Sequence, residues 1–598
     1  MKKPPLTGDA LAGFHGLVMA KTYLDVNPST RLTILESADT IGGVWCQGRL
    51  YSHLKTNNLL GTYEYSDFPM DTAKFGVKEG EFIPGPVVHE YLKAYAENFD
   101  IYRRIRFNSR VDTVTRRDNG GWDINFSEGV GEKTTSKSIT SARLVVATGL
   151  TSEPYVPRFA GQDDFDAPII HAKALMEQES LVHESKEVII LGGSKSGWDS
   201  AYAFANAGVP VNWIIRESGH GPMWMAPPYV TPLKKRLEKL VGVRFLSWFS
   251  PCIWGESDGF GWVRRMLHNT VIGRLMVDTF WKILANDVIT LNGYDKHPEL
   301  KKLKPWTPAF WVGSSLSILN YPTDFFDYVR NGTIKVHIAD IDHLSHKTAH
   351  LSTGVTVQGD AIICSTGWKP HPSIKFLPEG IDKRLGLPQT APNPTSAEAT
   401  RIQEADATVL DRFPRLRNQP TRGPSHKDFK DLRSLDARQH PALAQGEEEE
   451  PYRLYRFMVP PAFINERSIG FVGALMTLNT TIVAQAQALW LTAYFAHGLA
   501  IDRQQQGHAE KGPKPAFDID AVTDETVLHS RYCKWRYAAG FGLRFPDFVF
   551  DVVPYIDMLL QDVGLRSRRK KNGWSELFDP YGPEDYRGMV DEWRVKIA

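Results

Sequence analysis

The sequence contains little cysteine and no closely paired cysteines. The four cysteines among 598 residues are Cys46, Cys252, Cys364 and Cys533, and no two of them form a C-x-x-C motif. This pattern argues against a disulfide framework and against a cysteine-rich zinc site, and it favours a reducing compartment. It also argues against enzymes that depend on a redox-active cysteine pair. We therefore expect no metal site.

The chain also lacks a strong net charge and a secretory signal. Lys and Arg total 70 against 69 Asp and Glu, so the formal charge is +1 and supplies no global field for binding nucleic acid. Lys2, Lys3, Pro4 and Pro5 stand where a signal peptide would need an apolar run. We expect a cytoplasmic protein that binds no nucleic acid, with peripheral membrane contact and the oligomeric state left open.

No charged residue interrupts the stretch from Ser468 to Ala500, which is long enough to span a bilayer. However, Gly470, Asn479 and Gln485 are among the polar and flexible residues inside it, and polar groups are costly in lipid. We expect a strand, a loop and an amphipathic helix here, and no transmembrane span. The basic run from 566 to 571 is typical of a solvated loop, with an address or nucleic-acid patch as the alternative.

What the chain does contain is strands alternating with helices, in a length that suggests two or more domains. Short apolar strands are expected at 32–35, 144–147, 188–191, 211–215 and 361–364. This alternation predicts an α/β protein with doubly wound, Rossmann-like dinucleotide-binding domains. Residues 371–450, rich in proline, arginine and acid, predict a long surface excursion or a mobile lid.

One complete nucleotide-binding unit is visible at 188–216. A buried-strand run ends at Leu191, a turn follows with Gly192 and Gly197 in the first and third positions of G-x-G-x-x-G, and a helix comes next. Ser194 replaces the middle glycine, and Ser196 adds a hydroxyl. The next strand ends at Arg216, where an acid would bind a ribose diol, so the arginine favours a 2′-phosphate and NADPH.

A second unit near the N-terminus is less complete. Leu11 stands in the first glycine position, Gly13 and Gly16 fill the other two, and Glu36 ends the following strand, where an acid can bind the ribose of FAD. Residues 1–10 hold no apolar run of four. We therefore expect the preceding strand to be absent or poorly formed.

Further short motifs follow along the chain. They are Gly43-Val44-Trp45, Thr56-Asn57, Ser66-Asp67-Phe68-Pro69, Phe165 to His171 with Ala167 in a glycine position, Ser196-Gly197-Trp198-Asp199, Thr366-Gly367-Trp368 and Gln485 to Trp490. In this combination, over about residues 13–500, the chain resembles the flavin-containing monooxygenases, in the wider group that includes Baeyer–Villiger monooxygenases.

The resemblance implies FAD and NADPH as cofactors, and an organic substrate and O2 as reactants. It implies oxygenation through a flavin C4a-hydroperoxide, with N- or S-oxygenation expected, and a catalytic role for Asn57 in contact with flavin and NADP. The expected cofactor-binding residues are Gly13, Phe14, His15, Gly16, Glu36, Gly43, Val44, Trp45, Thr56, Asn57, Thr148, Gly192, Ser194, Ser196, Gly197, Trp198, Asp199, Arg216 and Gln485.

The implied architecture inserts the NADPH domain into the FAD domain. We expect the FAD domain at 1–172 and 346–505, the NADPH domain with an aromatic-rich insertion at 173–345, and a helical extension at 506–598. The aromatic residues of the insertion, Trp224, Trp248, Phe249, Trp254, Phe260 and Trp262, are expected to pack in a core. The alternatives are an apolar substrate channel and a membrane-facing patch.

Three other functions stay open from the sequence. The first is Baeyer–Villiger oxygenation of a ketone. The second is an NADPH oxidase that releases hydrogen peroxide without oxidising a substrate. The third is a non-catalytic relative that has lost FAD and still binds a nucleotide through the unit at 188–216.

Overall fold

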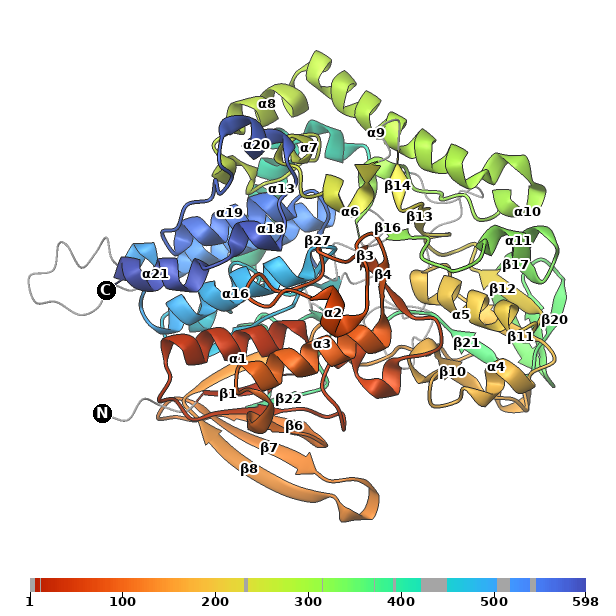
Figure 1. The fold of residues 1–598 in the computed structure, drawn as a ribbon, viewed down its shortest axis with the longest axis horizontal. Helices are drawn as coiled ribbons and strands as arrows, with labels where there is room; N and C mark the ends of the chain where they lie inside the picture. The colour runs from red at the N-terminus through yellow and green to blue at the C-terminus, as the bar shows by residue number, and fades with distance from the viewer. Residues whose placement is uncertain are drawn as a thin grey trace, which may run out of the picture.

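The computed structural model describes residues 6–10, 12–230, 235–313, 316–369, 371–390, 394–420, 449–502, 517–537 and 545–597. Two five-stranded parallel sheets lie side by side, and a helical region covers both (Figure 1). This arrangement confirms the predicted α/β class with two doubly wound units.

The first sheet has the strand order β25-β9-β1-β2-β5. Its strands are β1 (Leu6–Ala10), β2 (Leu32–Leu35), β5 (Ile105–Arg106), β9 (Arg143–Ala147) and β25 (Ile469–Phe471). Helices α1 (Phe14–Val26), α3 (Gly85–Asn98) and α16 (Thr480–Phe495) lie on one side. A four-stranded sheet lies on the other side, made of β22 (Lys375–Leu377), β6 (Ser109–Arg116), β7 (Trp122–Glu128) and β8 (Thr135–Ser141).

The N-terminal strand β1 is present, so the prediction that it is missing is wrong. It runs parallel between β2 and β9, with Leu6 opposite Leu32 on one side and Arg143 on the other. Backbone hydrogen bonds to two neighbours hold a strand in place without any run of apolar side chains. A search for apolar runs therefore overlooks such a strand.

The second sheet has the order β10-β21-β11-β12-β17. Its strands are β10 (Ile169–His171), β11 (Val188–Leu191), β12 (Val211–Ile215), β17 (Ile334–Ile338) and β21 (Ile362–Cys364), and the helices α4 (Ser180–Glu184), α5 (Lys195–Asn206) and α11 (Phe325–Arg330) accompany them. All side chains of β11 and β12 are buried, as expected for a parallel sheet covered on both faces.

The second unit is inserted in the first, because β25 returns to the first sheet after the second sheet is complete. The strands of the second sheet extend from 169 to 364, beyond the expected limits of 173 and 345. The difference arises at β10 and β21, each of which is only three residues long. Nothing in the sequence indicates which sheet such a short strand joins.

The uncharged stretch from Ser468 to Ala500 folds as β25, a loop and α16, as predicted. The expectation of an amphipathic helix is wrong, because every residue from Thr481 to Phe495 is buried. Helix α16 packs against both α1 and α19 (Val552–Asp562), so no side of it faces solvent. Among the described residues, no helix has the length and apolar character needed to cross a membrane.

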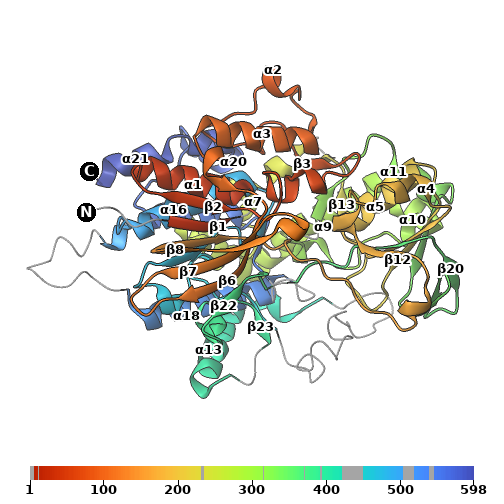
Figure 2. The same ribbon diagram turned by 90° about the horizontal axis from the view of Figure 1, so that it is seen from below.

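The segment 371–450 contains regular elements where the structure describes it. They are β22, α12 (Ile381–Arg384) and the 17-residue α13 (Ser396–Arg412), whose first turn is closed by a capping box of Thr395 and Glu398. Helix α13 packs on α18 (Ile519–Arg536), as Figure 2 shows, with Arg531 paired to Asp406. The expectation of a mobile lid stays a prediction, and residues 391–393 and 421–448 lie outside the described chain.

The insertion at 220–330 and the C-terminal extension form the helical region at the top and left of Figure 1. Its helices are α6 (Leu237–Leu240), α7 (Arg244–Ser247), α8 (Gly261–Asn269), α9 (Val271–Asn292), α10 (Pro298–Lys301), α18, α19, α20 (Gly573–Phe578) and α21 (Met589–Ile597). Trp224, Trp248 and Trp254 are buried, which agrees with packing in a core, whereas Trp262 is exposed.

Short elements complete the described chain. They are α2 (Thr72–Phe75), β3 (Lys55–Leu59), β4 (Phe82–Pro84), β13 (Trp224–Ala226), β14 (Tyr229–Val230), β15 (Lys235–Arg236), β16 (Leu316–Ile318), β18 (Ile341–Ser345), β19 (Thr348–Leu351), β20 (Thr356–Gln358), β23 (Gln389–Thr390), β24 (Glu449–Glu450), β26 (Met476–Thr477) and β27 (Asp547–Phe548).

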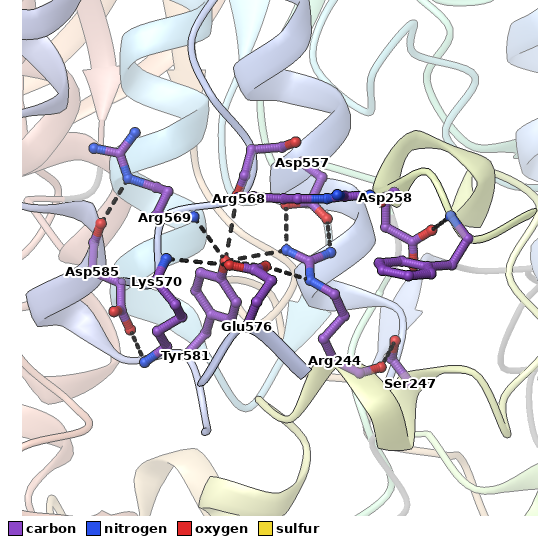
Figure 3. Close-up of polar contacts among 12 residues, drawn as sticks. Arg244, Ser247, Asp258, Asp557, Arg568, Arg569, Lys570, Glu576, Tyr581 and Asp585 are labelled. Atoms are coloured by element: carbon purple, nitrogen blue, oxygen red, sulfur yellow. Dashed lines mark hydrogen bonds and ion pairs between the residues drawn. The ribbon is translucent and has the colours of Figure 1, made fainter. Parts of the chain in front are cut away.

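A buried ionic cluster ties the insertion to the C-terminal extension (Figure 3). Arg244 of α7 is fully buried; it pairs with Asp557 of α19 and donates to Glu576 of α20 at 2.7 Å. Its guanidinium also donates to the Tyr581 hydroxyl at 3.3 Å. Asp557 and Glu576 balance this buried charge, so removing the arginine leaves unpaired carboxyl groups in the interior.

Candidate active site

The first nucleotide turn follows β1 and leads into α1, with Gly13 as the N-cap residue. The Gly42 N–H donates to the Ala12 carbonyl at 2.8 Å, which joins this turn to the 3₁₀ segment Gly43–Trp45. Gly42 has φ +122°, and a Cβ there would lie 2.7 Å from the Trp45 backbone, so only glycine fits. Leu11, the departure from the glycine pattern, lies outside the described residues.

Glu36 stands at the end of β2, beside this turn. Its carboxylate is fully buried and accepts hydrogen bonds from the backbone N–H groups of Ala12 and Ala38. Burial raises the pKa of Glu36 to about 7. An acceptor at this position suits the ribose of a dinucleotide held on the turn.

The second nucleotide turn packs too tightly for side chains at its glycines. A Cβ on Gly192 would lie 2.4 Å from the Ser365 carbonyl oxygen, and one on Gly197 would lie 2.2 Å from the Gly192 carbonyl oxygen. Ser194 is the exposed N-cap of α5, and its hydroxyl makes no capping bond. Ser196 lies in the first turn of α5 and is half-buried. This geometry leaves the α5 N-terminus free to receive a pyrophosphate.

Arg216 directly follows β12, on the edge where the second turn lies. Its Nη1 donates to the Ser218 hydroxyl at 3.0 Å and lies 3.9 Å from a carboxylate oxygen of Asp340. The guanidinium is thus held in place beside an acid. The contact of Arg216 with a 2′-phosphate stays a prediction.

Two of the predicted cofactor residues have their side chains in the core. Phe14 packs edge-on against Tyr63, with the ring centroids 4.6 Å apart, and Trp198 lies 4.5 Å from the ring of Phe325. Phe14 and Trp198 therefore shape the two turns by packing. His15 is half-buried in the first turn of α1, and desolvation lowers its pKa to about 4.

Gln485 of α16 supports a loop. Its Oε1 accepts from the Ser66 backbone N–H, and its Nε2 donates to the Ser66 hydroxyl and to Asp67. The side chain therefore orders the Ser66–Pro69 motif.

Two more of the predicted residues lie near the first turn in the fold. Thr148 directly follows β9, at the edge of the sheet that carries this turn. Val44 lies in the 3₁₀ segment that the turn contacts, and its side chain is exposed.

A cavity of about 270 Å³ lies between the two units. It is lined by Trp45, Leu54, Lys55, Thr56, Asn57, Asn58, Tyr63, Lys195, Asp199, Gly313, Leu316, Met476, Thr477, Leu478, Thr480, Asp547, Phe548 and Val549. It brings predicted residues of both units together, Trp45, Thr56 and Asn57 from the first and Asp199 from the second. The C-terminal extension adds Asp547, Phe548 and Val549.

Asn57 lies on β3 at the wall of this cavity. Its Oδ1 accepts a hydrogen bond from the Ser317 hydroxyl at 3.1 Å, which fixes the side-chain amide and directs its NH2 group away from Ser317. The neighbouring Thr56 is buried, and its hydroxyl donates to the Asn58 carbonyl at 2.5 Å. Ser317 thus orients the Asn57 amide, and Thr56 orders the backbone around it.

A polar bridge that the motifs do not indicate crosses the cavity wall. Lys195 of α5 pairs with Asp199 one turn later and donates to Asn320 Oδ1 at 3.0 Å. Asn320 in turn donates to the carbonyl oxygens of Lys55 and Thr56. The i, i+4 spacing of Lys195 and Asp199 was visible in the sequence, but nothing there marks Asn320.

Two tyrosines complete this bridge. The Tyr51 hydroxyl donates to Asp199 Oδ2 at 2.8 Å, and the Tyr321 hydroxyl donates to Asp199 Oδ1 at 2.8 Å. Asp199 therefore accepts from residues on both sides of the cleft. This arrangement fixes the second unit against β3.

A smaller chamber of about 30 Å³ adjoins the cavity and shares Leu316 and Val549 with it. It is lined by Trp224, Leu237, Val241, Trp281, Leu284, Ala285, Val288, Ala309, Val312, Leu316, Val549 and Phe550, all apolar. The inner face of α9 supplies four of these residues. The cleft therefore ends in an apolar compartment.

The fold and the site define a protein with two dinucleotide sites that share one cleft. The flavin-binding monooxygenase-like family matches this chain over residues 9–219. The FAD-dependent monooxygenase resA of Aspergillus sclerotiorum is 32% identical over 600 residues, covering 97% of this chain and 96% of its own. The FAD-dependent monooxygenase DEP4 of Alternaria brassicicola is 30% identical over 592 residues, covering 98% and 94%.

Solved structures share the fold. A closed crystal structure of cyclohexanone monooxygenase matches with a TM-score of 0.57 and 15% identity, covering 94% of this chain and 98% of that one. An oxidised steroid monooxygenase bound to NADP matches with a TM-score of 0.54 and 15% identity, covering 93% and 97%.

The chain belongs to the flavin-binding monooxygenase family and is a flavin-dependent monooxygenase. The predicted cofactors, FAD and NADPH, are those of this family. The described residues fit them, because close packing requires glycine at Gly42 beside the first turn and at Gly192 and Gly197 in the second. In addition, an acid follows β2 and an arginine follows β12.

Proposed function

We propose that this enzyme takes electrons from NADPH and transfers one oxygen atom of O2 to a nitrogen or sulfur atom of an organic substrate. The observation that carries the proposal is the common cavity, whose wall contains Asn57 from the first unit and Lys195 and Asp199 from the second. Electron transfer between two bound nucleotides needs this proximity. When bound, FAD and NADPH supply the reducing electrons and the activation of oxygen.

The chain's own residues hold and orient the reactants. Asn57, fixed by Ser317, presents a neutral amide to the cavity. The bridge of Lys195, Asp199 and Asn320 keeps the second unit in register with β3. Leu316, Phe548 and Val549 form an apolar wall that excludes water from the reacting atoms.

N- or S-oxygenation is supported by the chemistry of the lining. A neutral amide donor favours a protonated, electrophilic form of activated oxygen, which a soft amine or sulfide attacks without help from a base. Among the described residues, the lining contains no histidine and no arginine. The second candidate function is insertion of oxygen beside a ketone, which needs an anionic form of activated oxygen. The fold shared with cyclohexanone monooxygenase supports this alternative.

The test is a product analysis with the purified full-length chain. We expect flavin absorbance that bleaches with NADPH, and sulfoxide or N-oxide formed from an alkyl aryl sulfide or a tertiary amine. Lactone or ester formed from a ketone, with no heteroatom product, would replace the first proposal with the second. NADPH consumption that yields only hydrogen peroxide with all three probes would contradict both.

A further inference from the structure

Helix α9 lies along the edge of the molecule (Figure 1), and its outward side carries exposed apolar side chains, most of them in the first half of the helix. Its most exposed side chains are Val271 at 76%, Ile272 at 73% and Leu275 at 66%. Met276, Ile283 and Leu291 continue the same face. The apolar side chains are densest in the first turns of this 22-residue helix, because the polar residues Thr279, Lys282, Asn286 and Thr290 are also exposed farther along it. A cluster of exposed apolar side chains on a soluble protein marks an interaction site.

The preceding helix α8 extends this face. Trp262 is 66% exposed, and Met266 is exposed one turn later. We call the exposed side chains of Trp262, Met266, Val271, Ile272, Leu275, Met276, Ile283 and Leu291 the α8–α9 face.

Positive charge borders the α8–α9 face. Lys282 is exposed between its apolar side chains, and Arg265 is exposed beside Trp262 and also pairs with Glu256. Asp278 of α9 is already paired with Arg415. One of the two acidic groups of α9 is therefore neutralised.

The basic run at 566–571 lies against the same part of the fold. Arg568 packs over the ring of Phe260, 4.8 Å from its centroid, and donates to the Asp258 carbonyl, both just before α8. Arg566 and Lys571 of this run are exposed. An apolar helix face with an exposed tryptophan and a basic border is the pattern of helices that lie flat in a membrane interface.

We propose that the α8–α9 face docks this enzyme on an anionic lipid surface, with α9 lying parallel to the membrane plane. The four charged residues of α9, Arg274, Asp278, Lys282 and Asp287, agree with a helix that lies on a bilayer and does not cross it. A second copy of the chain is a poorer occupant, because self-association on this face would bring the two basic borders together.

The position of α9 gives the docking a consequence for the active site. Its inner side chains Trp281, Leu284 and Val288 line the apolar chamber that adjoins the cavity. One helix thus has lipid on its outer side and the apolar end of the cleft on its inner side. A membrane-bound enzyme therefore holds this apolar chamber next to the bilayer, where lipophilic molecules concentrate.

Vesicle flotation of the full-length protein tests the proposal, and it does not depend on catalysis. The probes are vesicles of phosphatidylcholine alone and of phosphatidylcholine with phosphatidylserine. The disrupted variant is Ile272→Asp with Leu275→Asp. The matched control is Val130→Asp with Val595→Asp, because these valines are 70% and 80% exposed on the β7–β8 hairpin and on α21, away from α9.

We expect the wild type and the control to float with phosphatidylserine vesicles, and the α9 variant to lose about tenfold or more in partitioning. Raised salt should weaken binding, and Lys282→Glu with Arg265→Glu should weaken it further. Equal flotation of the α9 variant, or no flotation of the wild type, would overturn the proposal. So would a wild-type dimer that the α9 variant converts to a monomer, since the face would then bind a second copy.

Discussion

Lys195 Nζ lies 3.0 Å from Asn320 Oδ1, and both residues belong to the second nucleotide unit. Asn320 also donates to the backbone of β3, which carries Asn57, and so connects the two units at the wall of the cavity. The residue that we expect to orient oxygen chemistry is therefore fixed relative to α5, the helix at whose N-terminus we expect NADPH to bind.

This connection predicts the effect of Lys195→Met. The substitution leaves Asp199 without its cation, and we expect the KM for NADPH to rise about tenfold, in line with the loss of a charged hydrogen bond. Flavin content should stay unchanged, because the hydrogen-bond partners of Lys195 are Asp199, Asn320 and Tyr321, all of the second unit. Steady-state kinetics test this, with the exposed Lys186→Met as control. An unchanged KM would show that the bridge does not position the coenzyme.

Asn57→Ala should separate NADPH consumption from oxygenation. Without the amide, we expect FAD and NADPH still to bind but product formed per NADPH to fall about tenfold or more, equivalent to about 1.4 kcal/mol. Hydrogen peroxide should account for the missing oxygen. Ser317→Ala, which removes only the anchor of Asn57, should have a smaller effect. An unchanged product yield would remove Asn57 from the mechanism.

Arg216→Ala should discriminate between the two nicotinamide coenzymes. We expect kcat/KM for NADPH to fall, because a charge-assisted hydrogen bond is lost. The loss should correspond to about 1 to 3 kcal/mol of transition-state free energy, while kcat/KM for NADH changes little. Both coenzymes are measured side by side. Equal losses would indicate that Arg216 acts by holding Ser218 and Asp340 and does not bind the 2′-phosphate.

Glu36 should make the flavin-free protein less stable as the pH rises from about 4.5 to about 7. Its pKa in the folded state is raised from 4.5 to about 7 by burial. In this range the folded state holds the proton that the unfolded state has lost, so raising the pH favours unfolding. The change amounts to about 3 kcal/mol and ends above pH 7, where both states are ionised.

Glu36→Gln provides the comparison. Urea unfolding of the flavin-free proteins at pH 5 and pH 8 should show a smaller difference in the free energy of unfolding for the variant than for the wild type. Equal differences in the two proteins would mean that the Glu36 carboxyl does not titrate in this range.

The buried Arg244 cluster should contribute strongly to stability. Arg244→Ala leaves Asp557 and Glu576 buried without their cation, and we expect a loss of about 3 to 5 kcal/mol in the free energy of unfolding. Arg265→Ala removes an exposed pair with Glu256 and should cost less than about 1 kcal/mol. Urea unfolding measures both. A similar small loss for both variants would mean that the cluster does not hold the C-terminal extension in place.

The sequence by itself determined the class of fold and the two nucleotide turns. Gly192, Gly197 and the strand to Leu191 form a local pattern, since a turn between a buried strand and a helix has steric demands that few residues meet. Glu36 and Arg216 were predicted from their positions at the ends of strands, whereas Asn57 was predicted only from the resemblance of Thr56-Asn57 to a family motif.

The tertiary structure decided what depends on partners distant in the chain. Strand β1 exists because β2 and β9 pair with it on both sides, although its own sequence carries no apolar run. Asn320 reaches β3 across more than 260 positions, and α16 is buried because α1 and α19 cover it. Local sequence records the preferences of a segment, whereas pairing, burial and the exposed face of α9 result from which segments meet in space.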